Sequence, residues 1–169
     1  MSFLLPVSLV LAGLDLGGRV GAVFPSSGLE LHHNSSARFG AFLGYSAGRS
    51  RYELAYAYAG LPGRQATPYR LDIQDIAASW SYEYLQRAGW SLDASTGASY
   101  SLLGRRTGAA RERGRSPAAR LGLGFAQRQG TSRLSIGLDN AVYIESAAGS
   151  GSIRLSYLFG IHAGVAYVF

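Results

Sequence analysis

The segment 153–169 alternates strictly between apolar residues and small or polar ones. The apolar positions are Ile153, Leu155, Tyr157, Phe159, Ile161, Ala163, Val165, Tyr167 and Phe169. A period of two is the geometry of a β-strand, whose side chains point alternately to its two faces. This apolar face is longer than a strand of ordinary length needs. It indicates a strand of a closed barrel that has lipid on its outside.

The same alternation recurs in seven earlier segments. They are 14–24, 37–47, 51–59, 71–85, 90–102, 118–127 and 132–143. We therefore expect an all-β fold, an eight-stranded antiparallel up-and-down transmembrane β-barrel that forms one domain over residues 13–169. An even number of strands allows the last strand to pair with the first, which removes the edges that lipid does not tolerate. In 71–85 the apolar phase slips between Ile73 and Ile76, which predicts a bulge there.

The connections between these segments alternate in length. Short ones cover 48–50, 86–89 and 128–131, whereas long ones cover 25–36, 60–70, 103–117 and 144–152. Short turns on one rim and long loops on the other are typical of outer-membrane barrels. Aromatic residues near the strand ends predict interfacial girdles. We place Tyr45, Tyr52, Tyr84, Trp90, Phe125 and Phe169 near the short-turn rim, and Phe24, Phe39, Tyr58, Tyr100 and Tyr143 near the long-loop rim.

The alternative is a soluble barrel or sandwich, with the apolar face inside. Charged residues make up only 15% of the chain, against roughly 25% in soluble domains. The polar faces are mostly Gly, Ala and Ser, which suits the cramped interior of a small barrel better than a solvent-exposed surface. These features favour the membrane barrel.

Composition also bears on partners and cofactors. The chain has no cysteine, which excludes disulfides and thiolate metal sites. Its net charge of +6 could suggest nucleic acid, but the arginines are scattered and no nucleic-acid motif is present. We expect no cofactor, no metal site and no nucleic-acid partner.

The first twelve residues form the only long apolar run of the sequence. The run is too short for a transmembrane helix, which needs about 20 residues. Its length and its Val10-Leu11-Ala12 ending fit a signal-peptide remnant, although a positively charged start is missing. A strand is the alternative, but its second face, with Leu4, Pro6 and Val10, is too apolar for a polar interior.

The inward faces of the predicted strands carry charges of both signs. We expect an interior charge network of Asp15, Arg19, Arg38, Glu53, Glu83, Asp93, Arg120, Arg133, Asp139, Arg154 and His162. Unpaired charges in a narrow lumen are costly, whereas paired ones can plug it. A plugged lumen is the favoured interpretation and a conducting path is the alternative. No acid and base are singled out by spacing, so no catalytic residue is assigned.

Two predicted loops carry other polar clusters. His32 and His33 could bind a metal weakly, and His33 could act as a base on Ser35 with Glu30 orienting it, but a solvated loop explains them as well. The segment 103–117 is strongly basic. Its arginines Arg105, Arg106, Arg111, Arg113 and Arg115 form a possible anionic-surface loop, because arginine pairs with phosphate groups such as those of lipopolysaccharide.

The whole pattern resembles the small eight-stranded outer-membrane barrels, the class of the OmpA transmembrane domain, OmpX and OmpW. The resemblance implies a bacterial outer-membrane location, contact with outer-membrane lipid and lipopolysaccharide, and a monomer. It also implies that Ile161, Ala163, Val165, Tyr167 and Phe169 are the signal read by the barrel-assembly machinery.

The resemblance leaves three functions open. The favoured one is non-enzymatic, a structural or surface-interaction role through the long loops. A narrow channel for small or hydrophobic solutes is the first alternative. A lipid A-modifying enzyme is the second, but the deacylase pattern has His and Ser two apart on a late strand, whereas His162 is followed by Gly164.

Overall fold

The computed structural model describes residues 13–26, 29–64, 69–107, 110–146 and 153–169. The predicted signal peptide, residues 1–12, lies outside the described residues. Side chains are described for these ranges except at 107, 110–112, 145–146 and 153–154. The side chains of Arg111 and Arg154, both predicted site residues, therefore lie outside the description.

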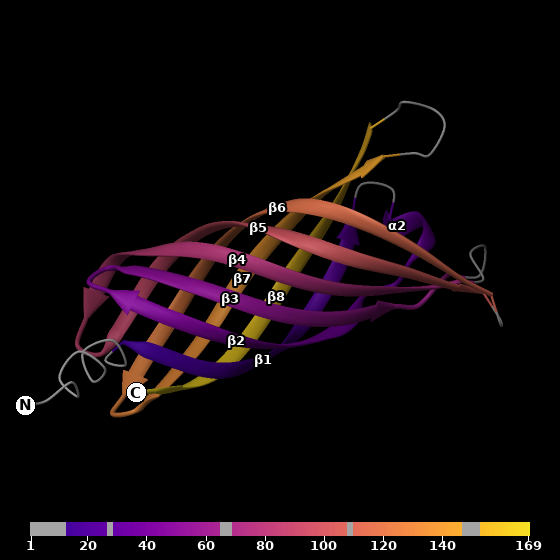
Figure 1. Ribbon diagram of the computed structural model, residues 1–169. Coiled ribbons are helices and arrows are strands. Elements are labelled where there is room, and N and C mark those ends of the chain that lie inside the picture. The colour runs from indigo at the N-terminus through magenta and orange to yellow at the C-terminus, as the bar shows by residue number, and fades with distance from the viewer. Residues whose placement is uncertain (1–12, 27–28, 65–68, 108–109, 147–152) are drawn as a thin grey trace, which may run out of the picture.

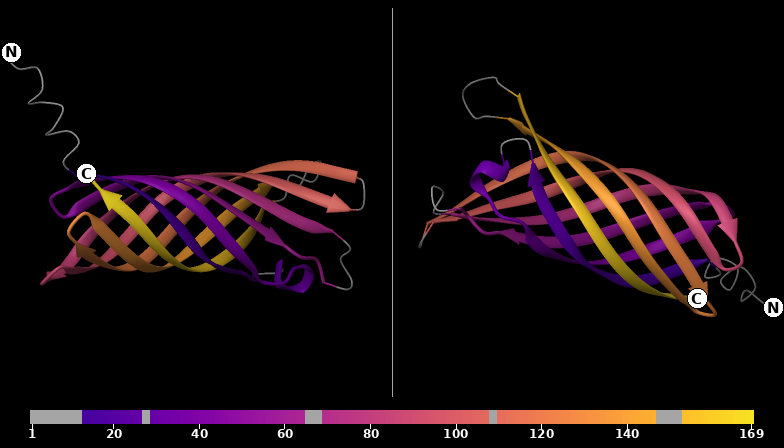
Figure 2. Two further views of the ribbon diagram at one scale, coloured as in Figure 1. Left: turned by 90° about the horizontal axis from the view of Figure 1, so that it is seen from below. Right: turned by 180° about the vertical axis from the view of Figure 1, so that it is seen from behind.

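The described residues form an antiparallel β-barrel closed by eight strands (Figures 1 and 2). The strands are β1 (Leu14–Ser26), β2 (Ser36–Ala47), β3 (Ser50–Leu61), β4 (Arg70–Arg87), β5 (Trp90–Thr107), β6 (Ala110–Gln129), β7 (Ser132–Ser146) and β8 (Ile153–Val168). One short helix, α2 (Leu29–His32), follows β1. Within the described ranges, no helix is long and apolar enough to cross a membrane.

Every strand pairs with its sequence neighbours, and β8 returns to pair with β1. That last ladder runs from Asp15 opposite Val168 to Ser26 opposite Tyr157. The predicted closing strand is therefore confirmed, and the fold class with it. Closure leaves the barrel without a strand edge facing lipid.

The outside of the barrel is apolar. Leu121, Ile136 and Val20 are 65%, 60% and 57% exposed, and the next residue along each strand turns inward, as the pleat requires. A continuous exposed apolar surface of this kind is not stable in water, so the wall of the barrel faces lipid.

The short-turn rim consists of two-residue hairpins. Gly48, Gly89 and Gly130 adopt positive φ in them, and Ala88 joins Gly89 with φ 38°. Positive φ in two-residue turns matches the twist of the strands on either side. The short connections predicted at 48–50, 86–89 and 128–131 are thus confirmed as tight turns.

The expectation about strand phase in 71–85 is wrong. The β3–β4 ladder is regular from Ser50 to Leu61, so the bulge predicted between Ile73 and Ile76 does not occur. The register shift lies in the β4–β5 ladder, at Glu83/Leu85. The predicted phase slip required Ile73 to face lipid like Ile76, but Ile73 and its neighbour Leu71 are buried in the apolar core of the lumen.

Tyr143 is also misplaced by the sequence prediction. It was assigned to the aromatic girdle, yet it lies inside the barrel and is only 3% exposed. It shares a face with Asp139 and Ala141, which also point inward. The loop-side end of the lumen accepts large side chains with apolar bodies. This explains why both Tyr143 and Leu71 lie inside.

The segment 103–117, expected to be a loop, is a β-hairpin. The β5–β6 ladder continues to Thr107 opposite Ala110, so the two strands project beyond the barrel at its loop-side end (Figure 1). Arg111, Arg113 and Arg115 occupy every second position of β6. This period of two is typical of a strand, but the repeated residue is arginine rather than an apolar residue.

Candidate functional site

The lumen holds the densest group of polar side chains, and it is built in layers along the barrel axis. Nearest the short-turn rim is a turn-side ionic layer, defined as Asp15, Arg19, Arg51, Glu53, Glu83, Asp93 and Arg133. Further along is a loop-side ionic layer, defined as Arg38, Asp75, Arg120, Asp139 and His162. No described ion pair joins a residue of one layer to a residue of the other.

Arg51 lies at the centre of the turn-side ionic layer. Its Nη2 and Nε atoms donate to the two carboxylate oxygens of Asp15, at 2.7 and 3.1 Å. Its Nη1 donates to Glu53, which also accepts two hydrogen bonds from Arg19. Asp15, Arg51 and Glu53 are all buried. Bidentate geometry of this kind is the strongest form of arginine–carboxylate pairing.

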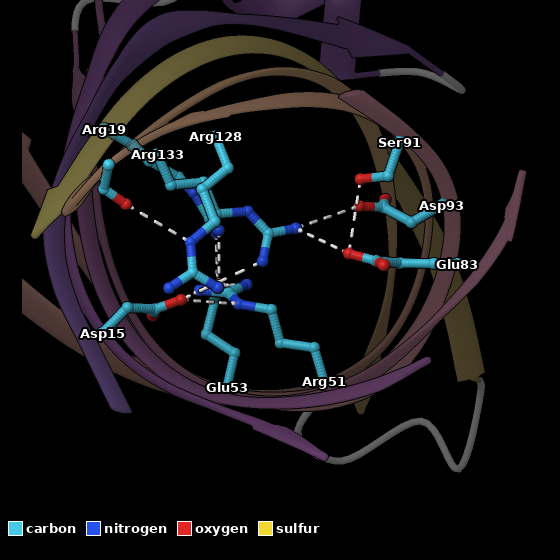
Figure 3. Close-up of polar contacts among 10 residues, drawn as sticks. Asp15, Arg19, Arg51, Glu53, Glu83, Ser91, Asp93, Arg128 and Arg133 are labelled. Atoms are coloured by element: carbon cyan, nitrogen blue, oxygen red, sulfur yellow. Dashed lines mark hydrogen bonds and ion pairs between the residues drawn. The ribbon is translucent and has the colours of Figure 1, made fainter. Parts of the chain in front are cut away.

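Arg133 connects this group to the opposite wall of the barrel (Figure 3). Its guanidinium lies 3.5 Å from Glu83, 3.7 Å from Asp93 and 4.0 Å from Asp15. Ser91 donates to Glu83 at 3.3 Å. The layer thus spans the lumen from β1 to β5 and blocks it with three arginines and four carboxylates.

One aromatic ring, Phe42, lies within the turn-side ionic layer. The guanidinium carbon of Arg19 is 4.2 Å from its centroid and that of Arg51 is 5.2 Å away. The ring is buried. Stacked cations of this kind are held by the negative face of the ring, so Phe42 fills space and fixes both arginines.

The loop-side ionic layer is centred on Asp139. Arg38 donates to its Oδ2 at 2.7 Å, and Arg120 donates to the same oxygen. His162 places Nδ1 3.4 Å from Oδ1. Both arginines also approach Asp75, at 3.5 and 3.6 Å. The result is a square of two arginines and two aspartates with a histidine beside it.

Asp75 is held further by two hydroxyl groups. Ser101 donates to Oδ1, and Tyr143 donates to Oδ2 at 3.1 Å. Both hydroxyl-bearing residues are buried. Hydroxyl donors satisfy carboxylate lone pairs that arginine leaves open, which a buried charge requires.

A cavity of about 140 Å³ separates the two ionic layers. It is lined by charged groups of both layers, among them Arg19, Arg133 and His162, and by serines such as Ser95 and Ser135. This polar volume is large enough for several water molecules.

An apolar cap closes the lumen on the loop side. It consists of Val23, Ala59, Leu61, Leu71, Ile73, Ala118, Ala141, Tyr143 and Leu158, with Leu29 and Leu103 packed against it. Leu61 is fully buried. Residues from nearly every strand meet here, so apolar side chains fill the lumen between the loop-side ionic layer and the rim in the described part of the chain.

Glycine makes room for the charged groups at two places. A Cβ on Gly44 would collide with Asp15 and Arg51, and one on Gly137 would lie 2.6 Å from Nε2 of His162. A Cβ at either position would therefore push charged side chains of the layers out of their present places. The glycine-rich inward face is therefore part of the ionic layers.

The structure places the predicted interior residues with described side chains in these two layers. Arg154 cannot be placed, because its side chain lies outside the description. Five contributors are absent from the predicted charge network: Arg51, Asp75, Ser91, Ser101 and Tyr143. Arg51 lies two residues before the predicted Glu53, and Asp75 two before the inward Ala77. Extending the alternation strictly would have found both.

The first loop-side connection packs against the second. His33 is buried, with its ring 5.1 Å from that of Tyr69, and it forms a β-bridge with Gly63. Burial lowers the pKa of His33, and the charges of His32 and Arg105 lower it further. Its Nδ1 has no hydrogen-bond partner in the described part of the chain, so no relay to Ser35 forms through that atom.

His32 and His33 were also considered as weak metal ligands. Among the described residues, no group of three or more His, Asp or Glu side chains is placed to hold a metal ion. A zinc site needs more ligands than two adjacent histidines supply.

The basic residues divide between the two faces of the β5–β6 hairpin. Arg106, Arg113 and Arg115 are exposed and share the outward face with Tyr100. Arg105 lies on the other face, 5.7 Å above the ring of Tyr69. The predicted cluster is therefore two groups rather than one.

The predicted assembly signal lies on the outward face of β8 and just beyond it. Ile161, Ala163, Val165, Tyr167 and Phe169 are all exposed to the lipid side. The rings of Tyr167 and Phe169 meet edge to face, with centroids 5.0 Å apart. Their role in assembly stays a prediction.

No protein-family model matches the sequence, and no curated protein matches it either. Solved structures do match. Neisserial surface protein A (NspA) aligns with a TM-score of 0.77 at 15% identity, over 93% of this chain and 97% of that one. The outer membrane protein OprG from Pseudomonas aeruginosa aligns with a TM-score of 0.65 at 11% identity, covering 94% and 96%. The outer membrane enzyme PagL aligns with a TM-score of 0.53 at 17% identity, covering 92% and 99%.

At such identities the likeness concerns the fold alone. It confirms the resemblance predicted from the sequence. The lipid-facing wall, the closed antiparallel ladder and the contrast between tight turns and long loop-side connections agree with it. The chain has the fold of the small eight-stranded outer-membrane β-barrels and is a transmembrane barrel of that type.

Proposed function

We propose that this protein is a sealed outer-membrane barrel whose role is structural or is surface contact through its loop-side end, and that it is neither a channel nor an enzyme. The observation that carries the proposal is the double closure of the lumen. A network of buried ion pairs blocks the turn side, and an apolar cap blocks the loop side.

The apolar cap is the main reason to disfavour a channel. An ion or a polar solute would have to pass between Leu61, Leu71 and Leu158, where it could not form hydrogen bonds. Moving a polar group into such surroundings costs several kcal/mol, and a full charge costs more. Among the described residues, apolar side chains therefore separate the cavity between the layers from the loop-side rim.

The lumenal histidine gives no support for lipid chemistry. His162 points into the barrel beside Asp139, whereas acyl chains meet the outside wall. The position two residues later, Gly164, has no hydroxyl to serve as a nucleophile.

Surface contact is supported by the loop-side end. The β5–β6 hairpin projects past the barrel and carries exposed arginines, and α2 adds an exposed Leu31. Long, exposed connections on a rigid barrel are where binding residues concentrate.

Planar-bilayer recording of the refolded protein tests the proposal. Wild type and the lipid-facing control Leu121→Ala should give no current steps. The double variant Leu61→Gly/Leu158→Gly, which opens the cap, should remain closed or conduct weakly, because the turn-side ionic layer persists. Regular conductance steps from the wild-type barrel would overturn the sealed-lumen proposal.

A further inference from the structure

The outward faces of β4, β5 and β6 carry a group of arginines just beyond the lipid-facing wall. We name Arg70, Arg106, Arg113 and Arg115 the outer arginine face. We propose that this face binds the phosphate groups of lipid A in the leaflet that surrounds the loop-side rim. The inference rests on the membrane placement in the proposed function, and it deepens the surface contact by naming the partner.

Strand register places these arginines together. Arg70 lies directly opposite Arg106 in the β4–β5 ladder. On the next strand, Arg113 lies opposite Gly104. Gly104 in turn lies opposite Asp72. Residues directly opposite each other share a face of the sheet, so three neighbouring strands present cations to the same side.

That side is the lipid side. Tyr100 on β5 and Ile76 on β4 are opposite each other and are 47% and 55% exposed. Arg106 and Tyr100 are separated by an even number of positions on β5, and such residues lie on the same face of a strand. Leu102, also exposed, lies opposite Arg115, so Arg115 is at the edge of the apolar wall and the other three arginines lie beyond it.

The height of the arginines matches the headgroup region. On β5 the apolar outward face covers residues 92–102. At roughly 3.3 Å per residue and a tilt of about 40°, this span is about 25 Å tall, the usual height of the apolar band. Arg106 and Arg113 lie beyond its loop-side limit, where a lipid phosphate would be.

The outer arginine face is short of negative charge. Asp72 accepts from Nε of Arg70 at 2.8 Å and from the hydroxyl of Tyr58 at 2.8 Å, and Tyr58 in turn accepts from Arg70 at 2.9 Å. Among the described side chains, no ion pair engages Arg106, Arg113 or Arg115. Cations directly opposite each other repel, so the arrangement favours an added anion.

Phosphate is the anion that this geometry suits. Guanidinium groups bind phosphate oxygens through two parallel hydrogen bonds, and several arginines on a flat sheet can share one doubly charged group. Tyr100 and Leu102 directly beneath offer apolar contact for the acyl chains of the same molecule. A lipid with phosphate at its head satisfies both halves of the surface.

Arg105 provides a matched internal comparison. It belongs to the same hairpin and is also exposed, but it faces the mouth of the barrel above Tyr69. The proposal predicts that Arg105 takes no part in lipid binding. Net attraction of any anion to a basic loop would instead make Arg105 as important as its neighbours.

The test measures binding of purified bisphosphorylated lipid A to the full-length refolded protein in detergent micelles by native mass spectrometry. The triple variant Arg106→Ser/Arg113→Ser/Arg115→Ser should weaken binding at least tenfold. A charge-matched control, Arg49→Ser/Arg87→Ser/Arg128→Ser, removes three exposed arginines from the opposite rim and should bind like wild type. Arg105→Ser should also bind like wild type.

Two further arms separate possible sources of the effect. Dephosphorylated lipid A should bind the wild type no better than it binds the triple variant. Inorganic pyrophosphate should displace bisphosphorylated lipid A from the wild type only at a concentration far above that of the lipid. The single variants Arg106→Ser and Arg113→Ser, checked for folding by heat-modifiable gel mobility, should each give an intermediate loss.

Three results would overturn the inference: equal losses in both triple variants, full binding of dephosphorylated lipid A, or equal competition by free pyrophosphate. Conductance measured on the same preparation keeps the two proposals apart. A conducting barrel that still binds lipid A through this face would remove the sealed-lumen proposal and leave this one standing.

Discussion

The two ends of the lumen are closed by opposite chemistry. On the turn side, Asp15, Arg51 and Glu53 form buried ion pairs. On the loop side, Leu61, Leu158 and their neighbours form an apolar cap. Both groups lie on the same inward faces of continuous strands. Alternation therefore determines which face a residue occupies, while the chemistry of the inward face changes along the barrel axis.

The difference has an energetic side. A buried ion pair gains little net stability over an apolar pair of the same volume, but breaking it leaves an uncompensated charge. Truncating an apolar side chain costs only the transfer free energy of the removed atoms and the free energy of the cavity they leave. Substitutions at the two ends should therefore differ in size and in what restores them.

The largest effect is expected for Arg51→Ala. The change strands the carboxylates of Asp15 and Glu53 inside the barrel and should lower the free energy of unfolding by about 3–5 kcal/mol. Reversible urea unfolding in lipid vesicles measures it. Arg49→Ala, an exposed arginine in the adjacent turn, should change the value by less than about 0.5 kcal/mol. Similar losses for the two variants would contradict the central role of Arg51.

The second effect tests the apolar cap. Leu61→Ala should lower the free energy of unfolding by about 2–5 kcal/mol, because the side chain is fully buried and leaves a cavity. The same unfolding assay applies. Leu121→Ala on the lipid-facing wall is the control and should lose clearly less, since no protein cavity forms there. A loss at position 121 as large as that at position 61 would mean that the cap is not tightly packed.

Tyr143→Phe tests the boundary between the cap and the loop-side ionic layer. The change removes a hydroxyl that donates to Asp75 at 3.1 Å while keeping the ring. We expect a loss of about 1–2 kcal/mol, since Ser101 still donates to Asp75. Tyr100→Phe, whose ring faces lipid, is the matched control. If the two variants are equally stable, the Tyr143 hydroxyl does not stabilise the ionic layer.

The smallest effect is local and depends on pH. Because burial lowers the pKa of His33 in the folded state, the neutral ring is favoured by packing and the unpacked loop binds a proton more readily. The contribution of His33 is therefore complete above its ordinary pKa of about 6.5 and is lost as the pH falls below that value.

Hydrogen-exchange protection factors measure this loss. The amides of Asn34 and Arg64 bond across the two connections, to Pro62 and His32, so their protection should fall between pH 7 and pH 5. The amide of Ser46, at the opposite rim, should stay constant. In His33→Gln the protection of Asn34 should no longer depend on pH. A wild-type profile that is flat over this range would contradict the assignment.

The strands and their order were predictable because lipid imposes a long, strict alternation on the outer wall. The same criterion failed where the inward face is apolar. Leu71 and Ile73 look like lipid-facing residues, and assigning them outward forced a bulge and hid Asp75. Carrying the phase back from Ala77 would have placed all three inward.

The ionic pairings themselves could not be predicted from the sequence. Whether a side chain points inward follows from the alternation along its strand. Which side chains pair with one another follows from the register between strands. Arg38 and Asp139 are distant in sequence, and Arg38 reaches Asp139 across the lumen rather than along a ladder. The basic hairpin was missed for a different reason, because its alternation consists of arginines and escapes a search for apolar residues.

The ladder between β1 and β8 has a kinetic consequence. Neighbouring strands elsewhere pair through local hairpins, whereas Asp15 and Val168 meet only when nearly the whole chain is in place. Closing so large a loop carries the greatest entropic penalty of any pairing in the fold and slows the step that forms it. Before that step, the edges of β1 and β8 have no partners. Completion of the barrel is therefore expected to be a late, all-or-none event that depends on the final strand.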